Sequence, residues 1–310
     1  MERLDAYLQR KQREIALLNG CLDAPLKLQR PTSAMEVIKQ KFQIAGALKA
    51  EHAIQDWALT ETAWAHTGRM KAGPFEFSYD YQRADLEVRG PSFYAHAGQS
   101  LHDTVYTSSG MSAISALLLT SVKVVQAADI LIMPGAYGET VELIESYAHH
   151  LRIVQTRGLS SDLASSSDRF RILLFDSSAS SLAFEAILRC AAPCLNLIIF
   201  DTTCFSSGSG RIRRVLSWAR RWRLPIVLVR SHTKLDSLGL EYGRLGSAVF
   251  VDAEEVCPPK RDILKGLSGE MRTAVRLFGG AAPPLIFCLA LEPKPTGRLL
   301  MRGSPRHFAK

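Results

Sequence analysis

Two kinds of hydrophobic pattern follow one another along this chain. Residues 1–20 and 34–65 place apolar side chains at helical spacing, and the second stretch contains a single glycine and no proline. Both stretches therefore predict helices with one apolar side. We expect residues 1–65 to form an N-terminal helical arm that packs against the remainder of the chain.

From Thr104 onward, short apolar runs alternate with helical patterns. The runs that predict strands are 129–135, 171–177, 196–203, 225–231 and 248–253. The stretches that predict helices between them are 114–126, 139–151, 181–191 and 213–222. Apolar strands separated by helices are typical of a mostly parallel sheet with helices on both faces. We therefore predict an α/β domain over residues 66–258 and a short C-terminal segment, 259–310, that forms an incomplete small domain.

The composition narrows the class of protein. The chain has 310 residues, of which 47% are hydrophobic and 22% charged, and this excludes a disordered or collagen-like protein. A formal net charge of +8 suits anionic ligands such as phosphate. The six cysteines form no CxxC pair, so we expect reduced thiols in a cytoplasmic protein. No run of 18 apolar residues occurs, so we expect no membrane span.

Several common site motifs are absent, and two local features have simple structural explanations. No P-loop, HExxH or GxSxG motif occurs, and no GxGxxG follows a strand. Cys190 and Cys194 are predicted to lie on the apolar face of one helix. His149 and His150 are predicted to end another helix, and no other residue of the kind that binds metals lies at a suitable spacing, so we expect no metal site. The arginine-rich stretch 211–225 predicts an amphipathic helix with a solvated face. Nucleic-acid binding is the alternative for that stretch, and it would depend steeply on salt.

In open α/β sheets, ligands bind beyond the carboxyl ends of the strands. The residues predicted at those positions form an unusual set. Ser109, Gly110 and Met111 open a helix, whose exposed amides favour an anion. Tyr137, Asp201 and Lys234 each follow a predicted strand. A phosphate cradle, an aromatic plane, a carboxylate and an amine together suit pyridoxal phosphate.

These segments resemble motifs of the fold-type I, pyridoxal-phosphate-dependent cystathionine gamma-synthase and methionine gamma-lyase family. The family has an SGM(A)A turn, a YGxT motif, a D-N-T strand end, an S-x-T-K motif and an upstream Y-x-R. The corresponding segments here are Ser109–Ala113, Tyr137–Thr140, Asp201–Thr203, Ser231–Lys234 and Tyr81–Arg83. The resemblance covers roughly residues 75–255. It implies an aspartate-aminotransferase-like large domain.

The resemblance also implies a cofactor, a reaction and an assembly. Lys234 would form the Schiff base with pyridoxal 5'-phosphate and shuttle protons, Asp201 would pair with the ring nitrogen, and Tyr137 would stack on the ring. The other residues that would contact the cofactor are Gly110, Met111, Ser180, Thr203, Ser231 and Thr233. Tyr81 and Arg83 would reach the phosphate of the neighbouring subunit, so the resemblance implies a homodimer or homotetramer with the active site at the subunit interface.

The implied activity is γ- or β-elimination or replacement on a sulfur-containing or O-activated amino acid, as in trans-sulfuration, by a lyase or transferase. Ser180 stands where the family has an asparagine, and Lys234 follows Asp201 by 33 positions, more than is usual in the family. Only 76 residues follow Lys234, and we identify no arginine there for the substrate carboxylate. A cofactor-binding pseudoenzyme or partner subunit without independent turnover is therefore the alternative. The substrate, and the choice between elimination and replacement, stay open.

Overall fold

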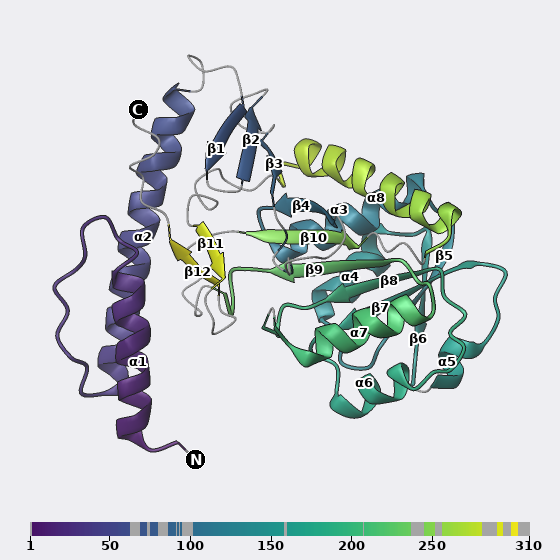
Figure 1. The fold of residues 1–310 in the computed structure, drawn as a ribbon, viewed down its shortest axis with the longest axis horizontal. Coiled ribbons are helices and arrows are strands. Elements are labelled where there is room, and N and C mark those ends of the chain that lie inside the picture. Colours follow the sequence, from purple (N-terminus) through teal and green to yellow (C-terminus); the bar gives the residue numbers. More distant parts are fainter. Residues whose placement is uncertain are drawn as a thin grey trace.

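A seven-stranded sheet forms the centre of the protein (Figure 1). This computed structural model describes residues 2–62, 69–72, 75–79, 86–90, 92, 94, 102–157, 160–206, 208–236, 245–251, 256–280, 290–293 and 299–302. In chain order, the strands of the central sheet are β4 (His102–Thr107), β5 (Ala128–Ile132), β6 (Leu151–Gln155), β7 (Phe170–Asp176), β8 (Leu197–Asp201), β9 (Ile226–Ser231) and β10 (Gly246–Val251). They lie side by side in the order β4-β10-β9-β8-β7-β5-β6.

The sheet is mostly parallel, as predicted. Strands β9, β8, β7, β5 and β6 pair in parallel. The strand β10 lies between β4 and β9 and runs antiparallel to both. The strands β9 and β10 are buried at every position, because both faces of the sheet are covered. The α/β class expected from the apolar runs is therefore confirmed.

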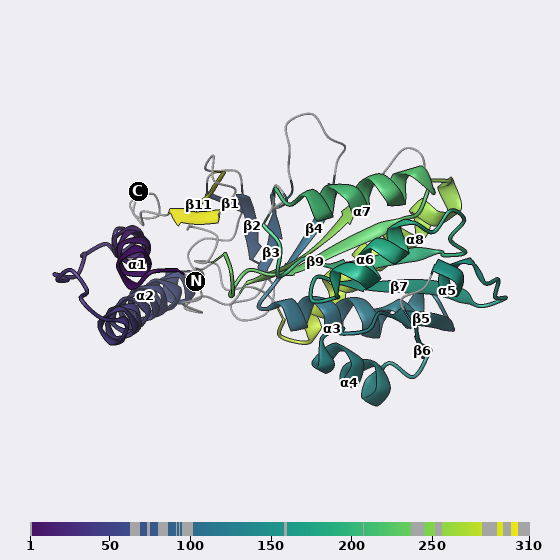
Figure 2. The same cartoon turned by 90° about the horizontal axis from the view of Figure 1, so that it is seen from below.

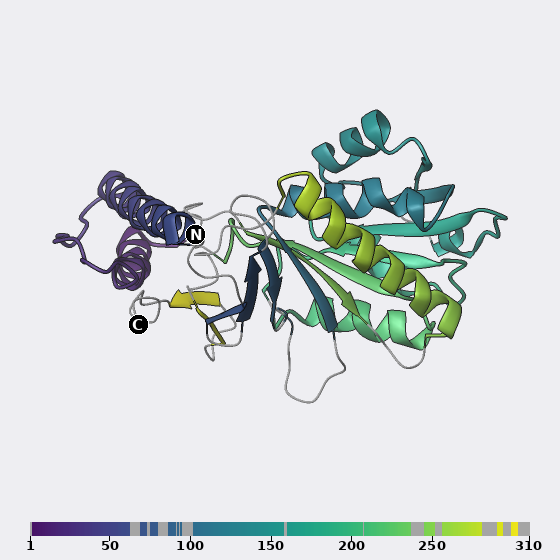
Figure 3. The same ribbon diagram turned by 90° about the horizontal axis from the view of Figure 1, so that it is seen from above.

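Helices cover the two faces of the sheet. They are α3 (Gly110–Thr120), α4 (Gly138–Tyr147), α5 (Ser160–Ala164), α6 (Ser181–Leu188), α7 (Gly210–Arg221) and α8 (Pro258–Leu277), and a 3₁₀ turn, η1 (Ser121–Lys123), follows α3. Apolar residues of α3, α4 and α8 share one buried cluster with the sheet, and those of α5, α6 and α7 share the other. Figures 2 and 3 show these two layers on opposite sides of the strands.

The N-terminal residues form the expected helices. The helices α1 (Leu4–Asn19) and α2 (Ala34–Thr62) pack together through a cluster that includes Ile15 and Ile44. Tyr106 of β4 belongs to the same cluster, so the arm packs against the edge of the central sheet. The helix α8 packs against α3. The limits of the α/β domain, at residues 66 and 258, stay a prediction.

Two short sheets complete the described part of the chain. The strands β1 (Arg69–Ala72), β2 (Phe75–Tyr79) and β3 (Leu86–Arg89) form an antiparallel sheet, and β11 (Ala290–Pro293) pairs with β12 (Leu299–Arg302). None of the helices in the described ranges is both long and apolar enough to cross a membrane.

Two predicted helix ends were wrong. The helix α4 ends at Tyr147, so His149 and His150 lie in a turn and not at the end of a helix. The helix α6 ends at Leu188, so Cys190 and Cys194 do not share a helical face, and Cys194 is exposed. Pro193 lies between the two cysteines and disfavours helical geometry at Ala192, so a helix that contains Cys190 does not continue to Cys194.

Candidate functional site

The carboxyl edge of the parallel strands brings the predicted site segments together. Tyr137 follows β5 and forms the N-cap of α4, while Asp176 and Asp201 end the neighbouring strands β7 and β8. The Tyr137 amide donates to Asp176 Oδ2 at 2.9 Å. The Ser231 amide, at the end of β9, donates to Thr203 Oγ1 at 3.0 Å. One hydrogen bond thus joins the loop after β5 to the end of β7, and the other joins the loop after β8 to the end of β9.

The amino end of α3 lies directly against the end of β9. A Cβ atom built on Gly110 would lie only 2.7 Å from Ser231 Cβ, so no larger residue fits there without displacing β9. Ser109 caps the helix by accepting the Ser112 amide at 3.0 Å. Ser231 Oγ in turn lies 2.9 Å from Thr233 Oγ1. The hydroxyls of Ser231 and Thr233 therefore lie near the amino end of α3, and this arrangement suits an anion.

A second glycine allows β10 to approach the same turn. A Cβ atom on Gly246 would collide with the carbonyl oxygen of Ser109. Met111, in the first turn of α3, is partly buried against the apolar cluster between α3 and the sheet. The turn at Ser109 and Gly110 is therefore fixed from both β9 and β10, while the Met111 side chain packs into the core.

Lys234 and Tyr137 meet at this edge of the sheet. The Lys234 ammonium lies 5.0 Å from the centroid of the Tyr137 ring, in the range of a cation–π contact. Lys234 is exposed, and Tyr137 retains 38% of its accessible surface. A hydrogen bond to Glu139 raises the pKa of the Tyr137 phenol, which stays protonated near neutral pH. The amine and the aromatic plane are thus adjacent and open to a ligand.

Asp201 stands in a position that disfavours its charge. Burial raises the pKa of the Asp201 carboxyl, and the neighbouring Asp176 raises it further, although hydrogen bonds with Thr203 oppose this. Asp201 Oδ1 accepts the Thr203 amide at 2.8 Å. A carboxylate placed in this way gains by pairing with a cationic group.

Not every predicted site residue joins this cluster. Ser180 is exposed and caps α6, accepting the Ala183 amide at 3.2 Å. Its hydroxyl oxygen therefore has a structural role in this chain. Tyr81 and Arg83 lie outside the residues that the structure describes, so their predicted contact with a partner's phosphate stays a prediction.

A buried charged group next to the turn that carries Lys234 was not predicted from the sequence. Arg230, at the end of β9, pairs with Asp236, and His232 contacts the same carboxylate. An arginine inside the apolar run that forms β9 was the signal for this group.

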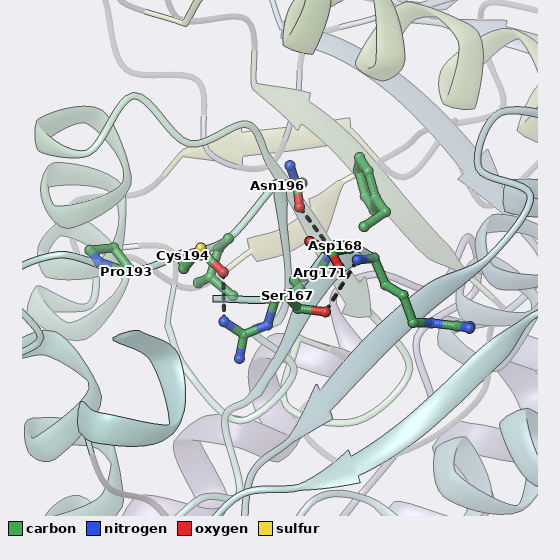
Figure 4. A pocket seen from close by; sticks show the side chains of 9 residues that line it. Ser167, Asp168, Arg171, Pro193, Cys194 and Asn196 are labelled. Carbon is green, nitrogen blue, oxygen red and sulfur yellow. Dashed lines mark hydrogen bonds between the residues drawn. The ribbon is translucent and has the colours of Figure 1, made fainter. Parts of the chain in front are cut away.

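A cavity of about 490 Å³ lies at the opposite, amino edge of the sheet (Figure 4). It is lined by Ser167, Asp168, Arg169, Phe170, Arg171, Pro193, Cys194, Leu195 and Asn196. The guanidinium of the buried Arg171 donates to carbonyl oxygens, among them that of Cys194 at 2.9 Å. The residues of the candidate site do not line this cavity, so its position does not coincide with the predicted chemistry.

Three solved structures show a distant likeness to this chain. No protein-family model matches the chain, and no curated protein sequence matches it. The chain is similar to the cytoplasmic aspartate aminotransferase of Giardia lamblia (TM-score 0.49, 11% identity), over 76% of this chain and 60% of that one. It is also similar to an aspartate aminotransferase of Trypanosoma cruzi (TM-score 0.43, 16% identity), over 59% of this chain and 50% of that one.

A third similar structure is the aromatic-amino-acid aminotransferase of Burkholderia pseudomallei, which is covalently bound to pyridoxal phosphate (TM-score 0.48, 11% identity; 76% of this chain, 60% of that one). The chain thus spans between half and 60% of the length of these three structures. At such low identity, the likeness concerns the fold and says nothing about the reaction.

Proposed function

We propose that this chain binds pyridoxal 5'-phosphate at the carboxyl edge of its sheet, with Lys234 as the amine that takes the cofactor's aldehyde. The observation that carries the proposal is the Lys234 ammonium 5.0 Å from the Tyr137 ring. Beside this pair, the amino end of α3 touches Ser231, three residues before the lysine. An amine, an aromatic plane and an anion-binding helix end are the groups that this cofactor requires.

Each side chain of the site fits a separate part of the cofactor. The Ser109–Gly110 end of α3 and the hydroxyls of Ser231 and Thr233 would hold the phosphate. The Tyr137 ring would pack on the pyridine ring, and the Asp201 carboxylate would pair with its protonated nitrogen. When bound, the cofactor supplies an electron sink for an amino acid that has lost a proton or a substituent.

For the reaction, we propose elimination or replacement on a sulfur-containing or O-activated amino acid. The resemblance of Tyr137–Thr140 and Ser231–Lys234 to the trans-sulfuration motifs supports this choice. The protonated phenol of Tyr137 supports it as well, because a positioned hydroxyl can donate a proton to a departing sulfur or oxygen. Lys234 would move the proton at the substrate's α-carbon. A homodimer or homotetramer, with Tyr81 and Arg83 serving the partner's phosphate, belongs to the same proposal.

The open site favours a second candidate, a cofactor-binding protein without independent turnover. Both Lys234 and Tyr137 are exposed in the isolated chain. Efficient catalysis by this kind of cofactor benefits from a site closed against water. This candidate predicts that the purified chain binds pyridoxal phosphate and converts no amino acid.

The test is to titrate the purified chain with pyridoxal phosphate and to record absorption spectra before and after borohydride reduction. We expect a visible band, and after reduction the cofactor should be found on the peptide that contains Lys234. The variant Lys234→Ala should lose the band. The control Lys123→Ala removes an exposed lysine that pairs with Glu270, and it should keep the band. A wild-type chain without any band refutes the proposal.

Turnover separates the remaining possibilities. The loaded protein should release a 2-oxo acid and ammonia from cystathionine or an O-activated homoserine, or, when a thiol is added, replace the leaving group by that thiol. Neither reaction needs an added amino-group acceptor. A requirement for a 2-oxo acid acceptor would instead identify transamination. A band fixed on Lys234 without any conversion would identify the protein without independent turnover.

A further inference from the structure

A buried ion pair between Arg230 and Asp236 joins the two ends of the turn that carries Lys234. Arg230 is 0% exposed and donates from Nε and one terminal nitrogen to both oxygens of Asp236, at 2.7 and 2.6 Å. Its other terminal nitrogen donates to the carbonyl oxygens of Thr202 and Phe205, at 2.5 and 2.6 Å. One guanidinium thus joins the end of β9, the turn that follows it and the loop after β8.

His232 extends this group to β10. Its Nδ1 lies 2.8 Å from Asp236 Oδ2, and its Nε2 lies 2.8 Å from Ser247 Oγ. Hydrogen bonds from Arg230 and His232 outweigh the effect of burial and lower the pKa of the Asp236 carboxyl, so this group is ionised and can only accept. Burial lowers the pKa of the His232 imidazole, which is neutral. Nδ1 therefore carries its proton, and Nε2 accepts from the Ser247 hydroxyl.

Asp236 is the common partner of these side chains. Arg230 precedes Lys234 by four residues and Asp236 follows it by two, so their ion pair closes the turn on both sides of the lysine. Buried charged groups are costly to desolvate and contribute little net stability compared with apolar packing. The net stability of the core therefore does not by itself account for this group beside Lys234.

We propose that Asp236, acting through Arg230 and His232, is a positioning residue that sets where the Lys234 amine stands relative to Tyr137 and the end of α3. The inference rests on the proposed function. The segment from His232 to Asp236 is a turn and not a helix or strand. The His232 amide donates to the Leu245 carbonyl oxygen at 2.9 Å, and the side chains of Arg230, His232 and Asp236 hold the two ends of the turn together. Displacement of a reacting group by about 1 Å is enough to reduce its effectiveness strongly.

The test compares Asp236→Asn with a matched control, Asp129→Asn. Asp129 is also buried, and it accepts two hydrogen bonds from one arginine, Arg152, at 2.9 and 2.8 Å. It lies at the start of β5, at the amino edge of the sheet, away from Lys234. For each variant we would measure the dissociation constant of pyridoxal phosphate by absorbance, the pH midpoint of the visible band, and the melting temperature.

We expect Asp236→Asn to raise the dissociation constant about tenfold or more. The pH midpoint of the visible band should also move by about half a unit or more. Asp129→Asn should lower the melting temperature and leave both of these values near those of the wild type. The inference is overturned when the two variants behave alike. A wild type that forms no band would instead refute the proposed function itself.

A milder variant decides the matter if Asp236→Asn does not fold. Ser247→Ala removes the partner of His232 Nε2 and keeps the pair between Arg230 and Asp236. It should raise the dissociation constant in the same direction by a smaller factor, about twofold to fivefold. Wild-type values for the constant and the pH midpoint in Ser247→Ala would overturn the inference.

Discussion

Asp176 and Asp201 stand side by side, in register, at the ends of β7 and β8, yet their surroundings differ. Asp176 accepts the Tyr137 amide at 2.9 Å and the amide and hydroxyl of Ser178 at 2.7 and 2.8 Å. Burial and the proximity of Asp176 instead raise the pKa of Asp201. Asp176 thus accepts three hydrogen bonds from two residues, whereas Asp201 accepts from Thr203 and its charged form remains disfavoured by burial.

We expect Asp201→Asn to stabilise the cofactor-free protein at neutral pH. Because the pKa of Asp201 is raised on folding, its contribution to stability is fully present below its ordinary pKa and is lost as the pH rises through the raised value. An asparagine has no charge to desolvate and can still accept the Thr203 amide. The melting temperature should therefore rise at about pH 7.5, and the gain should shrink towards about pH 4. Thermal unfolding at several pH values checks this.

The neighbouring substitution, Asp176→Asn, should act in the opposite direction. An amide in this place can accept with one oxygen only, so either the Tyr137 or the Ser178 amide loses its acceptor. Both hydrogen bonds are partly buried, so the loss of one should cost about 1 kcal/mol. Denaturant unfolding measures the loss. Changes of the same sign for Asp176→Asn and Asp201→Asn would show that the two carboxylates are not distinguished as described.

Gly110→Ala should impair both the fold and cofactor binding. The new Cβ would meet Ser231 Cβ at 2.7 Å, so the end of β9 or the start of α3 has to move. Overpacking of this kind typically costs about 1–3 kcal/mol. Since Ser231 begins the segment that carries Lys234, the affinity for pyridoxal phosphate should fall with the stability.

Gly138→Ala is the control for this prediction. Gly138 is also the first residue of a helix, α4, and a Cβ there would meet nothing within 4 Å. Its free energy of unfolding should stay within about 0.5 kcal/mol of the wild-type value. Equal effects of the two substitutions on unfolding and on cofactor affinity would contradict the close contact between α3 and β9.

The sequence patterns predicted the buried strands well and the sheet edges poorly. The strand β8 is apolar over Leu197–Phe200 because helices cover both of its faces, and a run of this kind is visible in the sequence. The strand β6 lies at the edge of the sheet and is only partly buried, so no strand was predicted there and Leu151 was assigned to the end of a helix. The strand β4 pairs with β10, which is far away in the sequence, and no local pattern announces that pairing.

In the candidate site, too, some residues could be predicted from the sequence and others could not. The positions of Tyr137, Asp201 and Lys234 after their strands followed from topology, because parallel strands end at one edge of a sheet. The buried group of Arg230, His232 and Asp236 did not follow. Its residues are close in sequence, but the reason for their burial is Ser247 on β10 and the carbonyl oxygens after β8, which only the folded chain brings together.

The cavity at the amino edge of the sheet should matter for stability and not for the cofactor. The buried Arg171 guanidinium donates to the carbonyl oxygens of Asp162 and Cys194, at 2.7 and 2.9 Å, and also to that of Ser165. Arg171→Met removes these donors and should lower the free energy of unfolding by about 2 kcal/mol or more. The affinity for pyridoxal phosphate should not change, since Lys234 and Tyr137 lie at the opposite edge.

Arg169→Met provides the comparison from the same cavity. Arg169 is partly exposed, and its partner Asp129 keeps a second arginine, Arg152. Loss of a partly exposed ion pair costs at most about 1 kcal/mol, so this variant should be nearly as stable as the wild type. Denaturant unfolding and cofactor titration of both variants give the answer. A change in cofactor affinity in Arg171→Met without a loss of stability would show instead that the amino edge is coupled to the site around Lys234.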